Sequence, residues 1–222
     1  MQPPFSCTAV TYSRIEGSLS VARLARYLVA SRNDKHYALR LYVWNIRLCE
    51  AFYLPTQIAE VSVRNAIHCA LLAKRGPDWH TRGSFLCTLP DRLRKELDDV
   101  IRTERAAYGT NMTADHLVSG LSFGFWLHLL TKNYEGVFWP TYFATCFPNM
   151  PATTSRDKLY KKVDKLRLFR NRIAHHKPIF DRSPKTEYNS LLEVIRWISD
   201  DTHWFTTMLT RVDQTINAKP KV

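Results

Sequence analysis

Apolar residues recur at intervals of three and four along most of the chain, and this periodicity limits the fold more than any other feature of the sequence. Val21, Leu24, Ala25 and Leu28 illustrate it, because they fall on one face of an α-helix that a serine at position 18 or 20 can cap. The same spacing returns in successive segments up to the C-terminal region. The sequence therefore predicts an all-α protein.

Start and stop signals divide the periodic segments into separate helices. Pro55 suits the first turn of a helix, and Gly76-Pro77 suits the end of one. The aromatic stretch at residues 134–150 is interrupted by proline and glycine, so we expect an irregular packed connector there. Helices are predicted at residues 34–52, 55–75, 91–108, 113–130, 156–176 and 184–204.

Length and composition fit a single domain. The chain has 222 residues, of which 45% are hydrophobic, and this is enough for one sizeable core. We predict a helical bundle of about six or seven helices over residues 18–216, preceded by a flexible arm at residues 1–17. The last residues, NAKPKV, are expected to fray.

Several features of the sequence predict a cytoplasmic protein without a membrane partner. No uninterrupted apolar stretch approaches the length of a membrane span, and the N-terminal residues lack the pattern of a signal peptide. The five cysteines are scattered and form no CxxC pair. Free thiols in a reducing compartment are therefore expected, rather than a zinc site or a disulfide framework.

The charge of the chain points to a polyanionic partner. There are 32 lysines and arginines against 20 acidic residues, which gives a net charge of +12. An excess of this size favours association with nucleic acid, although many basic proteins are merely soluble.

One charged residue falls where the helix predicted at residues 156–176 should bury an apolar one. Leu159, Val163, Leu166 and Ile173 share one stripe of this helix, and Arg170 falls in the middle of that stripe. A guanidinium group cannot be buried there alone. It needs an anionic or hydrogen-bonding partner, or a cleft that admits one.

Further polar groups gather at the C-terminal end of the same helix. Asn171 and His175 lie one turn apart, and Pro178 disfavours helical geometry at Lys177, so the helix should stop near His176. A histidine can both accept and donate a proton near neutral pH. Burial of an apolar helix face requires no polar groups at these positions. Arg170, Asn171 and His175 are therefore a candidate site.

The surrounding helix is strongly basic. Between residues 156 and 172 there are eight basic residues and two acidic ones. A solvated polar face is the plainer explanation for the outer lysines. As candidates for binding phosphates we retain the residues Lys165, Arg167, Arg172 and Lys177.

Residues 170–175, RNRIAH, resemble the Arg-x(4–6)-His signature of HEPN ribonucleases. The segments EAFYLP, EVSVRNAIH, LSFGFWLHLL and LRLFRNRIAHHKPIF occur in this order, and together they look like the Abi-like (abortive infection) protein family. The resemblance extends over roughly residues 21–205. It implies a HEPN-like helical bundle, cleavage of RNA without a metal or other cofactor, and a homodimer in which the arginines and histidines of two chains share a cleft.

The resemblance also implies roles for individual residues. His175 would act as the base that activates an RNA 2′-hydroxyl, and its copy in the second chain as the acid for the leaving oxygen. Arg170 would stabilise the charge that develops on the phosphorus centre, and Asn171 would orient the phosphate or the histidine. His176 has the next allowed spacing in the signature, so it remains an alternative or auxiliary residue.

A second polar strip lies on the helix predicted at residues 55–75. Glu60, Arg64 and His68 are spaced by four residues, so they share one side of an otherwise apolar helix. A buried Glu60–Arg64 ion pair, with His68 satisfied by hydrogen bonding, is the structural interpretation. Support for the RNA cleft, or a degenerate copy of the active motif, is the functional one.

The sequence thus favours a metal-independent endoribonuclease with a toxin-like role in abortive infection, that is, in defence against phage. An antitoxin protein or a guarding RNA would then restrain it. Two other interpretations stay open at this point. The chain could be a HEPN module that binds RNA without cleaving it, or a protein-interaction domain whose polar cluster holds a dimer together.

Overall fold

The structure, a computed structural model, describes residues 7–139 and 141–221 of the chain. The described residues form helices and no strands, which confirms the predicted all-α class. Residues 7–139 and 141–221 contain thirteen α-helices rather than the expected six or seven. They are α1 (Ala9–Leu19), α2 (Val21–Ala30), α3 (Lys35–Arg75), α4 (Gly83–Leu86), α5 (Asp91–Tyr108), α6 (Ala114–Gly120), α7 (Phe123–His128), α8 (Glu135–Phe138), α9 (Thr141–Cys146), α10 (Arg156–Ala174), α11 (Pro184–Ile198), α12 (Asp200–Leu209) and α13 (Val212–Asn217).

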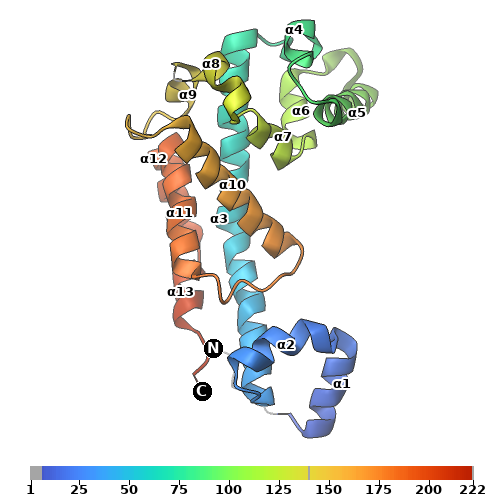
Figure 1. The fold of residues 1–222 in the computed structure, drawn as a ribbon, viewed down its shortest axis with the longest axis vertical. Coiled ribbons are helices and arrows are strands. Elements are labelled where there is room, and N and C mark those ends of the chain that lie inside the picture. The colour runs from blue at the N-terminus through green and yellow to red at the C-terminus, as the bar shows by residue number, and fades with distance from the viewer. Residues whose placement is uncertain (1–6, 140, 222) are drawn as a thin grey trace.

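Helix α3 is the central column of the molecule (Figure 1). The side chain of Asp34 caps its start by accepting from the N–H of Tyr37, and Gly76 ends it with a positive φ of 80°. The predicted break at Pro55 is wrong, because α3 runs through this residue without interruption. A proline inside a helix removes one hydrogen bond, but packing on both sides of it, at Phe52 and Ala59, holds the helix together.

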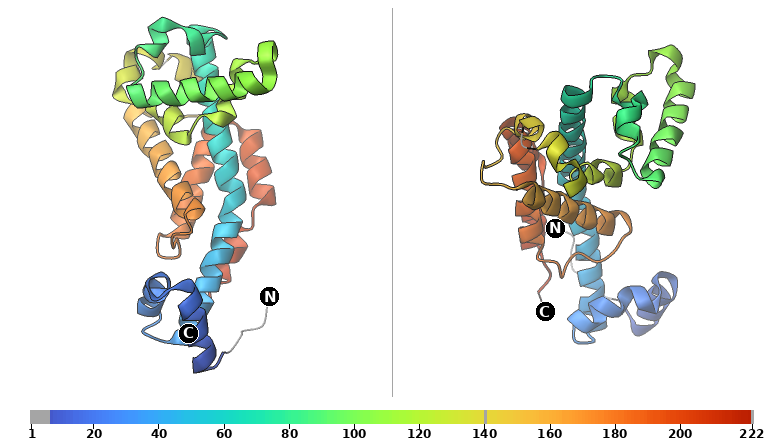
Figure 2. Two further views of the ribbon diagram at one scale, coloured as in Figure 1. Left: turned by 90° about the vertical axis from the view of Figure 1, so that its right-hand side faces the viewer. Right: turned by 45° about the horizontal axis from the view of Figure 1, so that its top comes forward.

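The other helices pack around α3 at different heights. Helices α1 and α2 lie at one end, α4 to α7 gather at the other end, and α11 to α13 run alongside (Figures 1 and 2). Helix α10 crosses α3 obliquely and also contacts α7 and α11. Since α10 carries the candidate site, its crossing with α3 decides what surrounds that site.

The apolar core consists of two main clusters that meet near this crossing. On α3, Ala59 belongs to the first cluster and Phe52 to the second; on α10, Leu166 belongs to the first and Phe169 to the second. Arg170 follows directly after this boundary. The inward position that the helical pattern assigned to Arg170 thus lies at the junction of the two clusters, not in the middle of either.

Two of the extra helices come from breaks inside segments that were predicted to be continuous. The irregular connector expected at residues 134–150 is wrong in part, because it contains the short helices α8 and α9, and α1, α4 and α13 lie where no helix was predicted. The segment at residues 113–130 breaks after Gly120, where a Cβ would lie 2.6 Å from Val100 Cγ1, and Ser122 then caps α7. The last long helix breaks at Ser199, whose side chain caps α12. Serine caps compete well with a continuous helix because they satisfy the free N–H groups of a new one.

Both ends of the described chain are folded onto the bundle. The flexible arm expected at residues 1–17 is instead part of α1 from Ala9 onward, and Tyr12 of this helix is buried against Leu24 and Leu39. Residues 1–6 lie outside the described residues. Near the other end, the hydroxyl of Tyr37 donates to the carbonyl of Pro220 over 3.1 Å, so the expected fraying does not start at residue 217. None of the described helices has the length and apolar content that a membrane crossing requires.

Candidate functional site

The candidate site begins at the C-terminal end of α10, which closes in a Schellman motif. The N–H of His176 donates to the carbonyl of Ile173 over 3.0 Å, and the N–H of Lys177 donates to the carbonyl of Arg172 over 2.8 Å. His176 takes the left-handed position of this motif, with φ of 54°. The helix therefore ends at Ala174, close to the predicted stop.

This closure gives the two adjacent histidines different positions. His175 is the C-cap residue and its side chain is exposed, whereas the backbone of His176 makes the turn. Arg23 of α2 donates a hydrogen bond from Nη1 to the carbonyl of His176. The backbone of His176 thus has a structural task that requires no imidazole.

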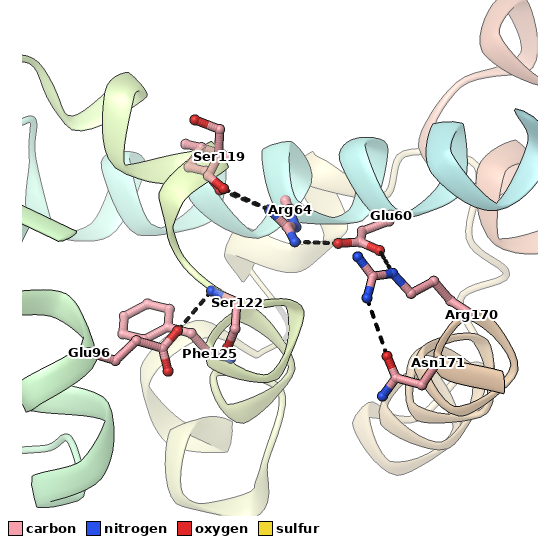
Figure 3. A network of polar contacts seen from close by, with 9 residues as sticks. Glu60, Arg64, Glu96, Ser119, Ser122, Phe125, Arg170 and Asn171 are labelled. Atoms are coloured by element: carbon pink, nitrogen blue, oxygen red, sulfur yellow. Dashed lines mark hydrogen bonds and ion pairs between the residues drawn. The ribbon is translucent and has the colours of Figure 1, made fainter. Parts of the chain in front are cut away.

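Arg170 is paired with a carboxylate from the central helix. Its Nε lies 2.8 Å from Oε2 of Glu60, and the other carboxylate oxygen of Glu60 accepts from Arg64 (Figure 3). The side chain of Glu60 is 9% exposed, while that of Arg170 is 41% exposed. Two guanidinium groups therefore share one buried carboxylate, and the cluster keeps one positive charge on its exposed side.

The expected Glu60–Arg64 ion pair is thus present, and it is joined to the candidate site directly. Arg64 also donates from Nη1 to the carbonyls of Val118 and Ser119, at 3.4 and 3.3 Å, so α6 helps to fix its position. Nη1 of Arg170 lies 3.4 Å from Oδ1 of Asn171 (Figure 3). Helix α3 holds Glu60, and Glu60 in turn holds Arg170 near Asn171.

His68, the third member of the predicted strip, lies apart from this cluster. Its ring packs against the indoles of Trp79 and Trp126, with centroids 5.9 and 5.8 Å away, and its Nδ1 lies 3.6 Å from a carboxylate oxygen of Asp115. Burial is the main reason that the pKa of His68 is lowered, and nearby Asp115 opposes the shift. His68 is therefore a core residue, one further turn away from Arg64. The hydrogen bonding expected for it is incomplete, because its buried Nε2 has no partner among the described residues.

His175 opens onto a hollow of about 510 Å³ on the outer side of α10. Its rim is basic, but several of the cations that were predicted to bind phosphate already have partners. Lys165 lies 3.2 Å from Glu187, Arg167 lies 2.6 Å from Asp164, and Arg172 donates to the carbonyl of Pro178 over 2.7 Å. The hollow is lined by Lys165, Leu168, Phe169, Asn171, Arg172, His175, Lys177, Arg182 and Glu187.

Arg170 faces a different space, a cavity of about 330 Å³ between α3 and α10. Asn171 contacts Arg170 and also lines the hollow of His175, so it connects the two spaces. Within one chain, therefore, the guanidinium and the imidazole do not face a common cavity. The arrangement can hold an anion at Arg170 and transfer a proton at His175, with Asn171 between them.

Three arginines near the site were missed by the sequence analysis. Arg182 lines the hollow of His175, Arg23 holds the turn at His176, and Arg26 forms an ion pair with Asp181. Burial and the nearby charges of Arg182 and Arg26 lower the pKa of Arg172. The dense arginines of α2 were visible in the sequence, but nothing local indicated that α2 would lie beside the end of α10.

The described residues contain no group of three or more histidines, cysteines, aspartates or glutamates that could hold a metal ion. The candidate site itself offers arginine, asparagine and histidine side chains. Comparison of the sequence with protein-family models, with curated proteins and with solved structures gives no match in any of the three.

Proposed function

We propose that this protein is a metal-independent endoribonuclease of the HEPN type, related to the Abi-like proteins. One observation supports this more than any other. Arg170, Asn171 and His175 all reach solvent at the end of one helix, and a buried carboxylate from α3 orients the arginine. A helix that served only to pack would have no need of a half-exposed arginine so oriented, next to an exposed histidine.

The chemistry follows from what these groups can do. His175 removes the proton from a ribose 2′-hydroxyl, whose oxygen attacks the adjacent phosphorus. The His175 of a second chain gives a proton to the departing 5′-oxygen. Arg170 stabilises the negative charge that builds up on the phosphoryl oxygens. The products are one fragment with a 2′,3′-cyclic phosphate and one with a 5′-hydroxyl.

A homodimer would supply the second histidine. The outer face of α10 carries Asp164, Leu168, Asn171 and His175 at helical spacing. Leu168 is 52% exposed in the middle of this polar face, and it lines the same hollow as His175. A two-fold contact centred on Leu168 would bury this leucine and place the two imidazoles on opposite sides of one phosphodiester.

The biological role proposed here is that of a toxin-like effector of abortive infection in the cytoplasm of a bacterial cell. This role follows from the resemblance to Abi-like proteins. A nuclease of this kind needs restraint, so an antitoxin protein or a guarding RNA is proposed as a further partner.

Binding of RNA without cleavage is the second candidate, and one contact favours it. Glu60 already occupies Nε of Arg170 and offsets part of its charge. The arginine can then still hold a phosphate, but it is less able to stabilise the extra charge of a transition state. A module that only grips RNA would show salt-sensitive binding and no products. A domain that only assembles would instead lose its dimer or its fold when Arg170 is replaced.

The test is incubation of the purified protein with total RNA in EDTA, followed by analysis of the fragment ends. We expect cyclic phosphate and 5′-hydroxyl ends, and a loss of about a hundredfold or more in rate for His175→Ala. Arg170→Ala should also lose activity but keep its fold, because Arg64 still pairs with Glu60. His176→Ala is the matched control and should stay active.

Circular dichroism and thermal unfolding would show that each variant is folded. A folded His175→Ala protein that cleaves at the wild-type rate would overturn the assignment of the base. Salt-sensitive RNA binding without fragments would favour the binding module. Unfolding or dissociation of Arg170→Ala, with no response to RNA, would favour the assembly domain.

A further inference from the structure

The cavity next to Arg170 lies where α3 and α10 cross, at the junction of the two apolar clusters. Its volume of about 330 Å³ is near the lower end of the range for small-molecule sites. It is large enough for one nucleotide unit and too small for a longer segment of RNA. The lining consists of Tyr53, Thr56, Gln57, Glu60, Val61, Arg64, Arg170, Ile173 and Ala174.

The cavity combines an aromatic ring at its rim with an unpaired polar group in its wall. Tyr53 is 64% exposed, which leaves its ring free for a planar ligand. Thr56 is buried, and its hydroxyl has no hydrogen-bond partner within the part of the chain that the structure describes. The hydroxyl is shielded from solvent in its present rotamer, and a rotation about χ1 would turn it toward the cavity. There it could pair with many edges of a heterocyclic base, because a hydroxyl both donates and accepts.

Arg170 adds a positive charge at the α10 side of the same cavity. Because Glu60 is shared between Arg64 and Arg170, the cluster retains one positive charge, and the exposed part of that charge is on Arg170. A ligand with a planar ring at Tyr53 and an anionic group at Arg170 matches this layout. A nucleotide joins a planar base to an anionic phosphate in one molecule.

We propose that this cavity binds the nucleobase adjacent to the phosphate that Arg170 holds, with the base stacked on Tyr53 and hydrogen-bonded to Thr56. The proposal rests on the proposed nuclease function for the source of the nucleotide, which is RNA. It adds that cleavage has a base preference, because the base beside the scissile phosphate enters a walled cavity. Tyr53 and Thr56 are then specificity-determining residues and take no part in proton transfer.

The experiment measures binding of the four nucleoside 3′-monophosphates to the full-length protein by calorimetry. We expect Tyr53→Ala to weaken binding by roughly five- to a hundredfold, as expected for loss of one stacked base. Thr56→Val keeps the shape of the side chain but removes the hydroxyl, so it should reduce the differences among the four bases. Tyr108→Ala removes an exposed tyrosine on α5 and serves as the control, with unchanged binding.

A 2′-deoxy oligonucleotide, which lacks the attacking hydroxyl, then separates the two sources of the base. Competition with the bound monophosphate supports a base carried by a polynucleotide. Binding of the monophosphate without such competition would overturn the proposal in favour of a free nucleotide. Absence of any nucleotide binding, or equal binding by wild-type and Tyr53→Ala proteins, would overturn it as well.

Failure of this proposal can be told apart from failure of the nuclease function. If the protein cleaves RNA, and both cavity variants leave nucleotide binding and the base next to the cleavage point unchanged, the cavity proposal is wrong and the nuclease stands. If nucleotides and the deoxy oligonucleotide bind in a Tyr53-dependent way while RNA stays intact, the cavity proposal stands and the nuclease is wrong.

Discussion

At the scale of single residues, Arg170 shows what an inward charge on a helix requires. The helical pattern alone predicted that this guanidinium needs an anionic partner or an open cleft, and the structure supplies both. The identity of the partner, Glu60, depended on how α3 and α10 cross. The sequence had grouped Glu60 with Arg64 as possible support for the site, but it gave no reason to exclude His68.

The adjacent histidines make a similar point. Their spacing from Arg170 left either one acceptable as the base. The left-handed backbone of His176 and its carbonyl contact with Arg23 now give that residue a role in closing the helix. Both histidines are exposed, but only His175 is among the residues that line the hollow on the outer side of α10, and for this reason we propose it as the proton-transfer group.

Buried histidines should make the stability of the protein depend on pH. Burial is the largest cause that lowers the pKa values of His68, His80 and His128. In the unfolded chain these groups titrate near the ordinary value of about 6.5. As the pH falls through this value, the unfolded chain takes up protons that the folded chain does not bind. These histidines therefore contribute their full stabilisation above about pH 7, and the free energy of unfolding decreases as the pH falls below about 6.5.

Urea unfolding at about pH 7.5 and about pH 5.5 measures this loss of stability. The variant His68→Gln should lose less stability between the two pH values than the wild-type protein, since one of the three histidines no longer titrates. An identical loss in the variant and the wild type would show that the burial of His68 has no part in the effect.

At the scale of elements, the connector that follows α10 is fixed by a side chain from α3. Oδ1 of Asn45, a buried residue, accepts from the N–H groups of Ile179 and Phe180 at 2.8 and 3.1 Å. These contacts hold the segment directly after the candidate catalytic turn. Removal of the acceptor would leave a buried N–H group without a partner.

We expect Asn45→Ala to lower the free energy of unfolding by about 1–3 kcal/mol. Asn65→Ala, an exposed position on the same helix, is the matched control and should change stability by less than about 0.5 kcal/mol. Urea unfolding of both variants provides the measurement. Equal stability of the two variants would mean that the connector does not depend on Asn45.

At the scale of the whole molecule, the site lies at the boundary between the two core clusters. The long helix α3 contributes residues to both clusters. On α10, Leu166 belongs to the first cluster and Phe169 to the second, so the boundary lies between these two residues. A boundary of this kind leaves room for a cavity and for a charged cluster. It also turns Leu168, with Asn171 and His175, toward the outside of the molecule.

The proposed dimer makes a prediction at this scale. Leu168→Glu should convert a particle of two chains into one of a single chain, and RNA cleavage should fall with it, because a second histidine is no longer present. Size-exclusion chromatography with light scattering gives the mass. Val29→Glu changes another exposed apolar residue, on α2, and should stay dimeric. A wild-type protein that is monomeric at concentrations where it cleaves RNA would contradict the dimer.

The sequence by itself determined the features of local structure that depend on residues close together in the chain. The helical class and the end of α10 before Pro178 follow from patterns within one or two turns. Tertiary structure decided the rest. The continuity of α3 through Pro55 and the pairing of Glu60 with Arg170 depend on packing between segments far apart in the chain. Local spacing carries no information about such contacts, because it fixes the faces of a helix but not what each face meets.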